Sequence, residues 1–258
     1  MFKNQQNVTH SARFLGFRKT ALALVLSQIL VLSAPAALAA TITVDTASGG
    51  ANDPNQCTLR DAITAANTDA ATGGCSAGAG ADTIILPANA TITLTTPDNP
   101  DNGLPVVTST ITIQGNGTTI NRNSGSPEFR IFEVKHGSLE LRDTVVRHGE
   151  VYDSGGGILL TDSTVTLINS TVSVNRTHGP YGGGGIDASN STLALISSTV
   201  SGNSCYFGGG GISSLNSIIT ITNSLISNNH TSDFGGGIRG SGIGKTVTST
   251  VTLVNSTV

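Results

Sequence analysis

The sequence contains no tryptophan, and aromatic residues make up only 4% of its 258 residues, so a folded core must be built from aliphatic side chains. Charged residues are also scarce, at 11%, and the formal net charge is −3. Such a chain offers neither the basic patch expected of a nucleic-acid-binding protein nor the acidic run of a charged tail. Glycine, in contrast, is abundant, with 32 residues. A chain rich in Gly, Ser and Asn is either disordered or regularly repeated.

The segment 1–39 differs in composition from the rest of the chain. Basic residues precede an apolar run at 21–32, and Ala37 and Ala39 then supply small residues at the two positions that signal peptidase reads. The apolar run is shorter than the roughly 20 residues that a membrane span needs. We therefore expect 1–39 to be a signal peptide and the mature chain, without a transmembrane span, to be exported to the extracellular space or to a bacterial cell surface or outer membrane.

Three cysteines remain after this segment. In an oxidising compartment Cys57 and Cys75 are natural partners, and the short loop that they would close predicts a stabilisation of about 3 kcal/mol. Cys205 has no obvious partner. We expect it to be a small residue at a solvent-exposed turn rather than a reactive thiol, although its role stays open.

Internal repeats dominate the second half of the chain. Four segments open on a run of glycines followed by isoleucine and recur every ~26 to 28 residues. An earlier partial copy, at 138–149, lacks the glycines. Each copy alternates β-branched or aliphatic residues with polar ones, a pattern typical of half-buried strands. The isoleucines are Ile158, Ile186, Ile212 and Ile238.

Stacking the repeats about 4.8 Å apart would place equivalent side chains directly over one another. One such column is Leu167, Leu195, Ile221 and Leu253. Leucine-rich repeats need a different leucine and asparagine spacing, propeller blades need about 40 residues, and disorder does not explain aligned aliphatic columns. The pattern predicts an all-β protein, a right-handed parallel β-helix, over 83–258. The last repeat stops partway through, so we expect this β-helix to continue beyond Val258.

Two further sets of residues recur with the repeat. Asn175, Asn203 and Asn229 occupy equivalent positions, six residues after the strand corner of each repeat. Stacked asparagines can bond from coil to coil through their side-chain amides. Tyr181, Phe207 and Phe234 precede the glycines. A packing ladder is the simpler interpretation of these aromatics, and a carbohydrate-binding platform is the alternative.

Between the signal and the repeats, the sequence CTLRDAITAAN at 57–67 predicts a short amphipathic helix. Leu59 and Ile63 lie on its apolar face, and Thr58 with Asp61 resembles a capping box. We expect 40–82 to form an N-terminal cap over the first coil, because an open end of a stacked sheet is prone to aggregate. Arg60 and Asp61 are given a structural role there.

These residues also carry a family resemblance. CTLRDAITAAN resembles the CSLREA motif of bacterial exported proteins, from which it departs at Thr58 and Asp61. GADTIILPANATITL at 80–94 and ITIQGNGTTI at 111–120 are similar to the segments that follow this motif, and the glycine repeats resemble those of polymorphic outer-membrane proteins and related pectate-lyase-like β-helices. The resemblance covers roughly 41–258. It implies a right-handed β-helix, exported and often adhesive, and no defined catalysis.

Candidate catalytic residues are few. Asp187 and Arg239 follow repeat isoleucines and should share a face two coils apart, with no second carboxylate in their column. His148, His178 and His230 lack metal-ligand spacing, so we expect solvated turn residues, no metal site, no cofactor and no catalytic group.

Three functions remain open. The first is a non-enzymatic, adhesin-like scaffold that binds host or cell-surface glycans or proteins through Tyr181, Phe207, Phe234 or Asp187. The second is a polysaccharide lyase or hydrolase of the pectate-lyase-like fold. The third is a structural spacer.

Overall fold

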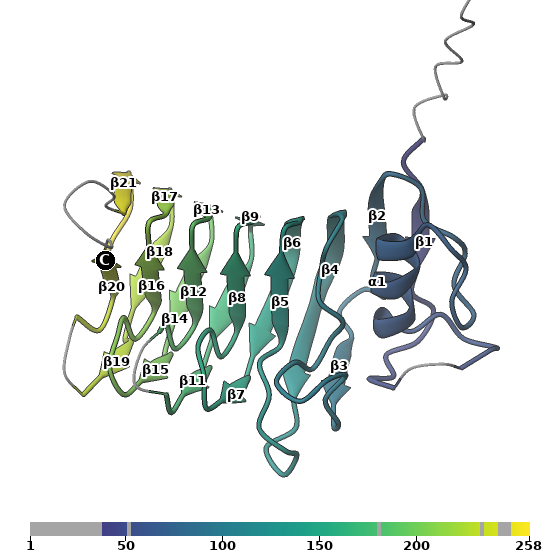
Figure 1. Ribbon diagram of the computed structural model, residues 1–258, viewed down its shortest axis with the longest axis horizontal. Helices are drawn as coiled ribbons and strands as arrows, with labels where there is room; N and C mark the ends of the chain where they lie inside the picture. The colour runs from purple at the N-terminus through teal and green to yellow at the C-terminus, as the bar shows by residue number, and fades with distance from the viewer. Residues whose placement is uncertain (1–37, 51–52, 180–181, 233–234, 242–248) are drawn as a thin grey trace, which may run out of the picture. The chain divides into compact units, whose positions relative to one another are not determined.

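The chain coils into short parallel strands that stack along one axis, as a computed structural model shows for residues 38–258 apart from 51–52, 180–181, 233–234 and 242–248 (Figure 1). Strands one repeat apart in the sequence lie side by side, because each coil buries its apolar side chains only against its neighbours. The predicted right-handed parallel β-helix with one short N-terminal helix is confirmed. The predicted signal peptide lies outside the described residues, except for Leu38 and Ala39.

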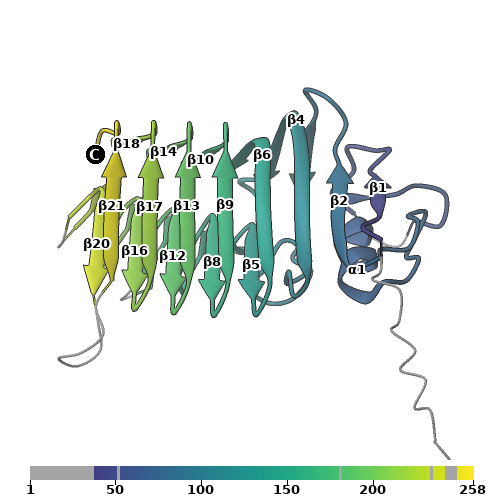
Figure 2. The ribbon, with the colours of Figure 1, turned by 90° about the horizontal axis from the view of Figure 1, so that it is seen from above.

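The largest sheet follows one face of the stack and takes one long strand from each coil (Figure 2). Its path is β1 (Thr41–Thr43), β2 (Ala81–Ile85), β4 (Thr110–Arg122), β6 (Ser138–Arg147), β9 (Thr164–Ile168), β13 (Thr192–Ile196), β17 (Ile218–Thr222) and β21 (Thr250–Val254). Shorter strands beside this path are β3 (Thr91–Leu94), β10 (Thr171–Ser173), β14 (Thr199–Ser201) and β18 (Leu225–Ser227).

Two smaller sheets complete each coil. One contains β7 (Glu150–Val151), β11 (Arg176–Thr177), β15 (Ser204–Cys205) and β19 (His230–Thr231). The other contains β5 (Phe132–Lys135), β8 (Ile158–Thr161), β12 (Ile186–Ser189), β16 (Ile212–Leu215) and β20 (Ile238–Ser241).

The aliphatic column predicted from the repeats is present. Leu167 pairs with Leu195, Leu195 with Ile221 and Ile221 with Leu253, all in parallel register. Leu141 extends the column toward the N-terminus. Each of these side chains is buried except Leu253, in the last described coil, and burying one such side chain contributes about 1.5–3 kcal/mol.

The chain changes direction at a column of corner residues in the left-handed region. Asn169, Ser197, Asn223 and Asn255 have φ values of 48°, 50°, 50° and 48°. Asparagine tolerates this conformation because its short polar side chain can hydrogen-bond locally. The recurrent NST sequence is therefore a corner followed by the next strand.

The glycine runs are required mainly by close approach of neighbouring backbones. A Cβ at Gly184 would lie 2.3 Å from the carbonyl oxygen of Ser204, and one at Gly185 would lie 2.7 Å from the carbonyl oxygen of Gly211. Both distances are shorter than side chains allow. Few other residues fit here, which explains why the runs recur in every complete repeat.

Helix α1 (Leu59–Thr68) lies against β1, β2 and β4 at the N-terminal end of the stack. The Thr58 hydroxyl caps the helix. Its oxygen accepts a hydrogen bond from the Asp61 amide at 3.2 Å, and the hydroxyl donates a hydrogen bond to the Asp61 carboxylate at 2.8 Å. Leu59 and Ile63 are fully buried. The predicted cap segment 40–82 also contains β1, which pairs with β2 and so continues the main sheet.

The cap is held by a disulfide and by a buried arginine. Cys57 and Cys75 form a disulfide at the start of α1. The guanidinium of Arg60 donates to the carbonyl oxygen of Thr96, and its burial lowers the pKa of this group from its usual value. Arg60 and Asp61 thus stabilise the cap.

The expectation for Cys205 was wrong. The residue belongs to β15 and is buried, not exposed at a turn. Position 205 alternates with outward-facing neighbours, so its side chain turns inward. Burial raises the pKa of its thiol, which keeps the sulfur protonated and unreactive.

Candidate functional site

Asparagine side chains bond from coil to coil just after the second short strand of each repeat. Asn203 accepts hydrogen bonds at Oδ1 from the backbone and side-chain amides of Asn175, at 2.9 and 3.0 Å. Asn229 accepts the same pair from Asn203, at 3.0 and 2.9 Å. Each amide also donates to a buried backbone carbonyl. The three asparagines form a ladder that fixes the corner between the largest sheet and the β7–β19 sheet.

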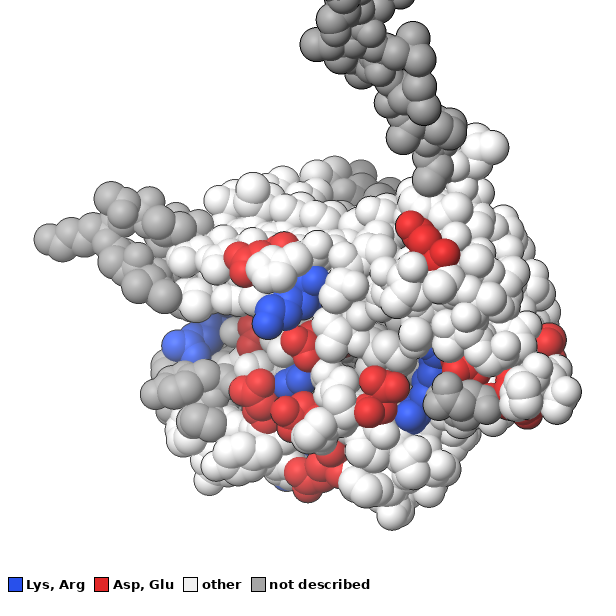
Figure 3. Space-filling model, turned by 45° about the vertical axis from the view of Figure 1, so that its right-hand side comes forward, with Lys and Arg blue, Asp and Glu red and all other residues white. Residues whose placement is uncertain are grey.

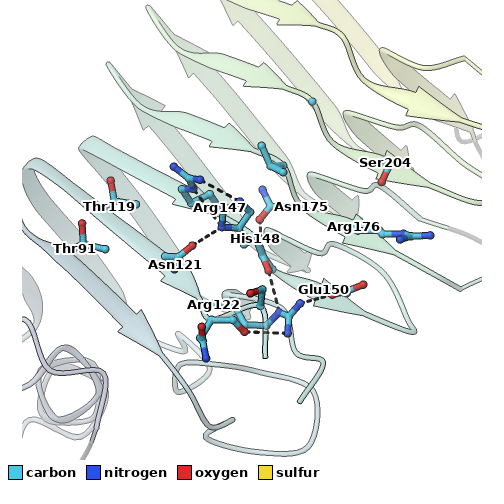
Figure 4. A pocket seen from close by; sticks show the side chains of 15 residues that line it. Thr91, Thr119, Asn121, Arg122, Arg147, His148, Glu150, Asn175, Arg176 and Ser204 are labelled. Atoms are coloured by element: carbon cyan, nitrogen blue, oxygen red, sulfur yellow. Dashed lines mark hydrogen bonds and ion pairs between the residues drawn. The ribbon is translucent and has the colours of Figure 1, made fainter. Parts of the chain in front are cut away.

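A cavity of about 530 Å³ lies along this corner and crosses several coils (Figure 4). We call it the corner groove. Its walls come from β3, β4, β6, β7, β11 and β15 and from the turns between them. The lining residues are Thr91, Thr119, Asn121, Arg122, Asn123, Ser124, Arg147, His148, Gly149, Glu150, Val174, Asn175, Arg176, Gly202 and Ser204.

His148 and Arg147 lie next to one another in the corner groove (Figure 4). The His148 Nδ1 is 2.6 Å from the Oδ1 of Asn121, and its Nε2 is 3.1 Å from the guanidinium of Arg147. A neutral ring that carries its proton on Nδ1 satisfies both contacts. Burial, and then the charges of Arg147 and Arg122, lower the pKa of His148. The ring is therefore neutral at pH 7 and orients Arg147.

Arg122 closes the other side of the corner groove. Its guanidinium pairs with the Oε2 of Glu150 and donates to the carbonyl oxygens of Ser126 and His148, at 2.9 and 3.0 Å. The side chain is only 4% exposed. Arg122 therefore holds the 123–127 turn and Glu150 in fixed positions.

One residue of the corner groove has a strained backbone. The position after the second short strand is occupied in successive coils by His148, Val174, Gly202 and Asn228, with φ between 53° and 65°. Glycine and asparagine adopt this conformation readily, whereas a β-branched residue rarely does. Val174 nevertheless has φ 55° and is 51% exposed. Strain of this kind concentrates at functional sites.

The charge of the corner groove is positive although the chain is acidic overall. Arg122 is neutralised by Glu150, but none of the ion pairs among the described residues includes Arg147 or Arg176. Charged side chains are sparse on the face drawn in Figure 3, where acidic and basic side chains lie close to one another. Two unneutralised guanidinium groups therefore mark the corner groove as a place for an anionic group.

A second polar cluster surrounds Arg130, whose side chain is only 3% exposed. Its guanidinium donates to the Oδ1 of Asn102 at 2.7 Å and pairs with Asp153 at 3.0 Å and Glu133 at 3.6 Å. Asn102 in turn donates to Glu133 at 2.7 Å. This cluster joins a loop, β5 and the turn before β8.

Asp187, on β12, adjoins this cluster. Burial raises the pKa of Asp187 to about 6, hydrogen bonds from Ser154 and Gly183 oppose that rise, and the charge of Asp153 adds to it. The expectation that Asp187 has no second carboxylate in its column was wrong, because the register runs from Glu133 through Leu159 to Asp187. Arg239 lies two strands further, through Ser213, as expected.

His148 and His178 lie in turns, as the sequence predicts, but are half-buried, whereas His230 is exposed. Besides His148, His178 is 2.9 Å from Glu150 and 3.8 Å from Glu128, measured from its Nε2 to the nearest carboxylate oxygens. No metal site was expected, yet Glu128, Glu150 and His178 together could hold a metal ion. His230 is exposed on β19.

Of the predicted aromatic ladder, Tyr181 and Phe234 lie outside the described residues. Phe207 is partly buried, and its ring packs edge-on against Tyr206 at 4.8 Å between centroids. Phe207 therefore makes a packing contact, and it is not one of the residues that line the corner groove.

Sequence reasoning missed the corner groove altogether. Arg122, Arg147 and Glu150 lie before the glycine repeats, in coils that share only the aliphatic pattern. The one available signal was the column that carries Val174, where a valine replaces the glycine or asparagine of later copies.

Comparisons with protein-family models, with curated proteins and with solved structures find no match to this chain. Within the described part of the chain, none of the helical segments has the length and apolar character needed to cross a bilayer.

Proposed function

We propose that this chain is an exported, non-enzymatic β-helix scaffold of a cell surface or extracellular space, which binds acidic glycans through the corner groove in the manner of an adhesin. The composition of 1–39 and the resemblance to exported CSLREA-motif proteins support export. The observation that carries the binding proposal is the pair of guanidinium groups, Arg147 and Arg176, that lack a carboxylate partner among the described residues.

The groove suits a linear anionic polymer. Guanidinium groups bind carboxylate or sulfate groups in a planar, bidentate geometry. Arg147 and Arg176 come from successive coils, since Arg147 pairs with Ser173 and Arg176 with Glu150. Both side chains line the corner groove, on either side of Asn175 (Figure 4), so a chain that lies along the groove can contact both cations. Asn121, Ser204 and the Glu150 carboxylate add hydrogen-bonding groups for sugar hydroxyls.

The proposal is tested by measuring binding of the purified chain to immobilised glycans that carry uronate or sulfate groups. We expect the variant Arg147→Ala/Arg176→Ala to lose at least tenfold in affinity. We also expect wild-type binding to weaken with added salt. Arg142→Ala is the matched control, because Arg142 belongs to β6 like Arg147 but pairs with Glu140 outside the corner groove. Equal binding by both variants and wild type would exclude the corner groove as the binding site, and no binding by wild type would favour the spacer.

Cleavage of polysaccharides is the second candidate function. It is favoured by Asp187, whose pKa near 6 suits a general acid, beside Asp153 and Arg130. Glycosidases of most families use two carboxylates that differ in protonation. Release of shortened products from pectin- or alginate-like polymers, abolished in Asp187→Asn, would support this function. Inactivity across a broad panel would dismiss it.

A further inference from the structure

We propose that Glu128, Glu150 and His178 form a binding site for a divalent transition-metal ion, with Zn²⁺ as the preferred ion. One donor atom from each residue lies within 4.8 Å of the other two. The site lies beside the corner groove, with which it shares Glu150. The two proposals share Glu150, but neither Arg147 nor Arg176, the cations that carry glycan binding, takes part in the metal site.

The donor spacing is close to that of a zinc site. Zinc bonds of about 2.1 Å in tetrahedral geometry place neighbouring donor atoms about 3.4 Å apart. The Nε2 of His178 is 2.9 Å from the Oε1 of Glu150 and 3.8 Å from the Oε1 of Glu128. These two distances bracket the ideal value. Glu128 is 53% exposed, so its side chain can adjust without disturbing the core.

The backbone positions of the three ligands are fixed. Glu150 donates its amide proton to the carbonyl oxygen of Phe129 at 3.0 Å, which holds β7 beside the residue that follows Glu128. His178 donates its amide proton to the carbonyl oxygen of Val151, also at 3.0 Å. The ligands thus come from three segments that hydrogen bonds tie together, which lowers the entropy that binding would cost.

Arg122 orients the central carboxylate. It pairs with the Oε2 of Glu150, while the Oε1 is the atom nearest His178. It also donates to the carbonyl oxygens of Ser126 and Pro127, at 2.9 and 3.3 Å, directly before Glu128. One arginine therefore positions both acidic ligands, as outer groups commonly do around metal sites. Its charge offsets one of the two carboxylates.

The ligand set selects a transition metal. Imidazole nitrogen suits Zn²⁺, whereas Ca²⁺ and Mg²⁺ prefer oxygen ligands alone, six or more for Ca²⁺. Three protein ligands leave a fourth position for water, which partial exposure of His178 and Glu150 permits.

A separate observation concerns Thr177, which precedes His178 in the sequence. The hydroxyl of Thr177 is buried and has no hydrogen-bond partner among the described residues. Thr177 and His178 both line a second cavity, of about 220 Å³. Buried polar groups are rarely left without a partner. A water molecule in this cavity, which His178 also lines, would supply one.

The test is isothermal titration of ZnCl₂ into the full chain, purified without a histidine tag and stripped of metal. We expect one Zn²⁺ per chain. CaCl₂ and MgCl₂ should bind at least tenfold more weakly. His178→Ala and Glu128→Gln should each weaken Zn²⁺ binding at least tenfold. Because Glu128 is exposed, the Glu128→Gln variant should stay folded and test binding even if the His178→Ala variant does not fold.

His136→Ala is the matched control, because His136 is an exposed histidine 4.0 Å from a single carboxylate, that of Asp162. It should bind Zn²⁺ as wild type does. The proposal is overturned if wild type binds no Zn²⁺, if Glu128→Gln binds it unchanged, or if His136→Ala loses as much affinity as His178→Ala. Any of these results would make the three residues an ion-pair cluster only.

Discussion

The side-chain amide of Asn175 donates a hydrogen bond to the Oδ1 of Asn203 over 3.0 Å, although the two residues are 28 positions apart in the sequence. Asn203 and Asn229 thereby each satisfy a backbone amide and a side-chain amide of the coil before them, and Asn175 satisfies the backbone amide of Gly149. The ladder runs beneath the corner groove, of which Asn175 forms part. The scaffold and the candidate binding site thus share residues.

Removing the centre of this ladder should destabilise the protein. Asn203 is fully buried and makes hydrogen bonds to Asn175, Val172 and Asn229. We expect Asn203→Ala to lower the free energy of unfolding by about 2–4 kcal/mol, because several buried polar groups lose their partner. Urea unfolding followed by circular dichroism measures the effect. Asn229→Ala, at a partly exposed site, should cost less. Equal and small costs would show that the ladder contributes little.

Relieving the backbone strain at Val174 should stabilise the protein. We expect Val174→Asn to raise the free energy of unfolding by about 1 kcal/mol, because asparagine adopts positive φ at lower cost. Placing a valine at the equivalent position of the next coil, by Gly202→Val, should lower the free energy of unfolding by a similar amount. Thermal unfolding of both variants is the measurement, and a less stable Val174→Asn would refute the strain argument.

Asp187 should make stability depend on pH. Its pKa rises from an ordinary 3.8 to about 6 on folding, so the folded chain binds more protons than the unfolded chain between these values. Stability is then highest below about pH 4, falls as the pH rises toward 6 and is flat above. Asp187→Asn removes this dependence and should stabilise the chain at pH 7 by about 1–3 kcal/mol. Urea midpoints across pH 4–7 measure it.

Asp162→Asn serves as the control for this series. Asp162 lies at an exposed corner with φ 49°, which asparagine also accepts. Its variant should keep the wild-type fall in stability between pH 4 and 6. A flat profile in wild type would contradict the account of Asp187.

The disulfide should stabilise the cap more than the rest of the stack. We expect Cys57→Ser/Cys75→Ser to lose about 2–4 kcal/mol in the segment around α1. Hydrogen exchange of amides in α1 and in β17 separates a local from a global effect. Protection should fall in α1 and persist in β17, whereas an equal fall in both would show one cooperative unit.

Much of the fold could be predicted because it repeats. The column of Leu167, Leu195 and Ile221 and the corners at Asn169 and Asn223 recur at a spacing that only stacking explains. The burial of Cys205 was predicted wrongly because β15 has only two residues, and a shift of its register by one residue exchanges the inward and outward side chains.

The candidate sites could not be predicted in this way. Arg147 and Arg176 occupy different positions of their coils, and Glu128 lies between β4 and β5, before the glycine repeats. The register of stacked coils brings the groove residues together, and the hydrogen bonds of Arg122 bring Glu150 close to the turn that carries Glu128. No spacing in the sequence reports these contacts.

The central claim is that the corner groove binds an acidic glycan without cleaving it. The most direct measurement is the length distribution of a bound uronate polymer, recovered by size-exclusion chromatography after prolonged incubation with wild-type protein. The account predicts that the polymer is recovered intact and that Arg147→Ala/Arg176→Ala retains almost none of it. Shortened chains that disappear with Asp187→Asn would contradict the account and establish an enzyme instead.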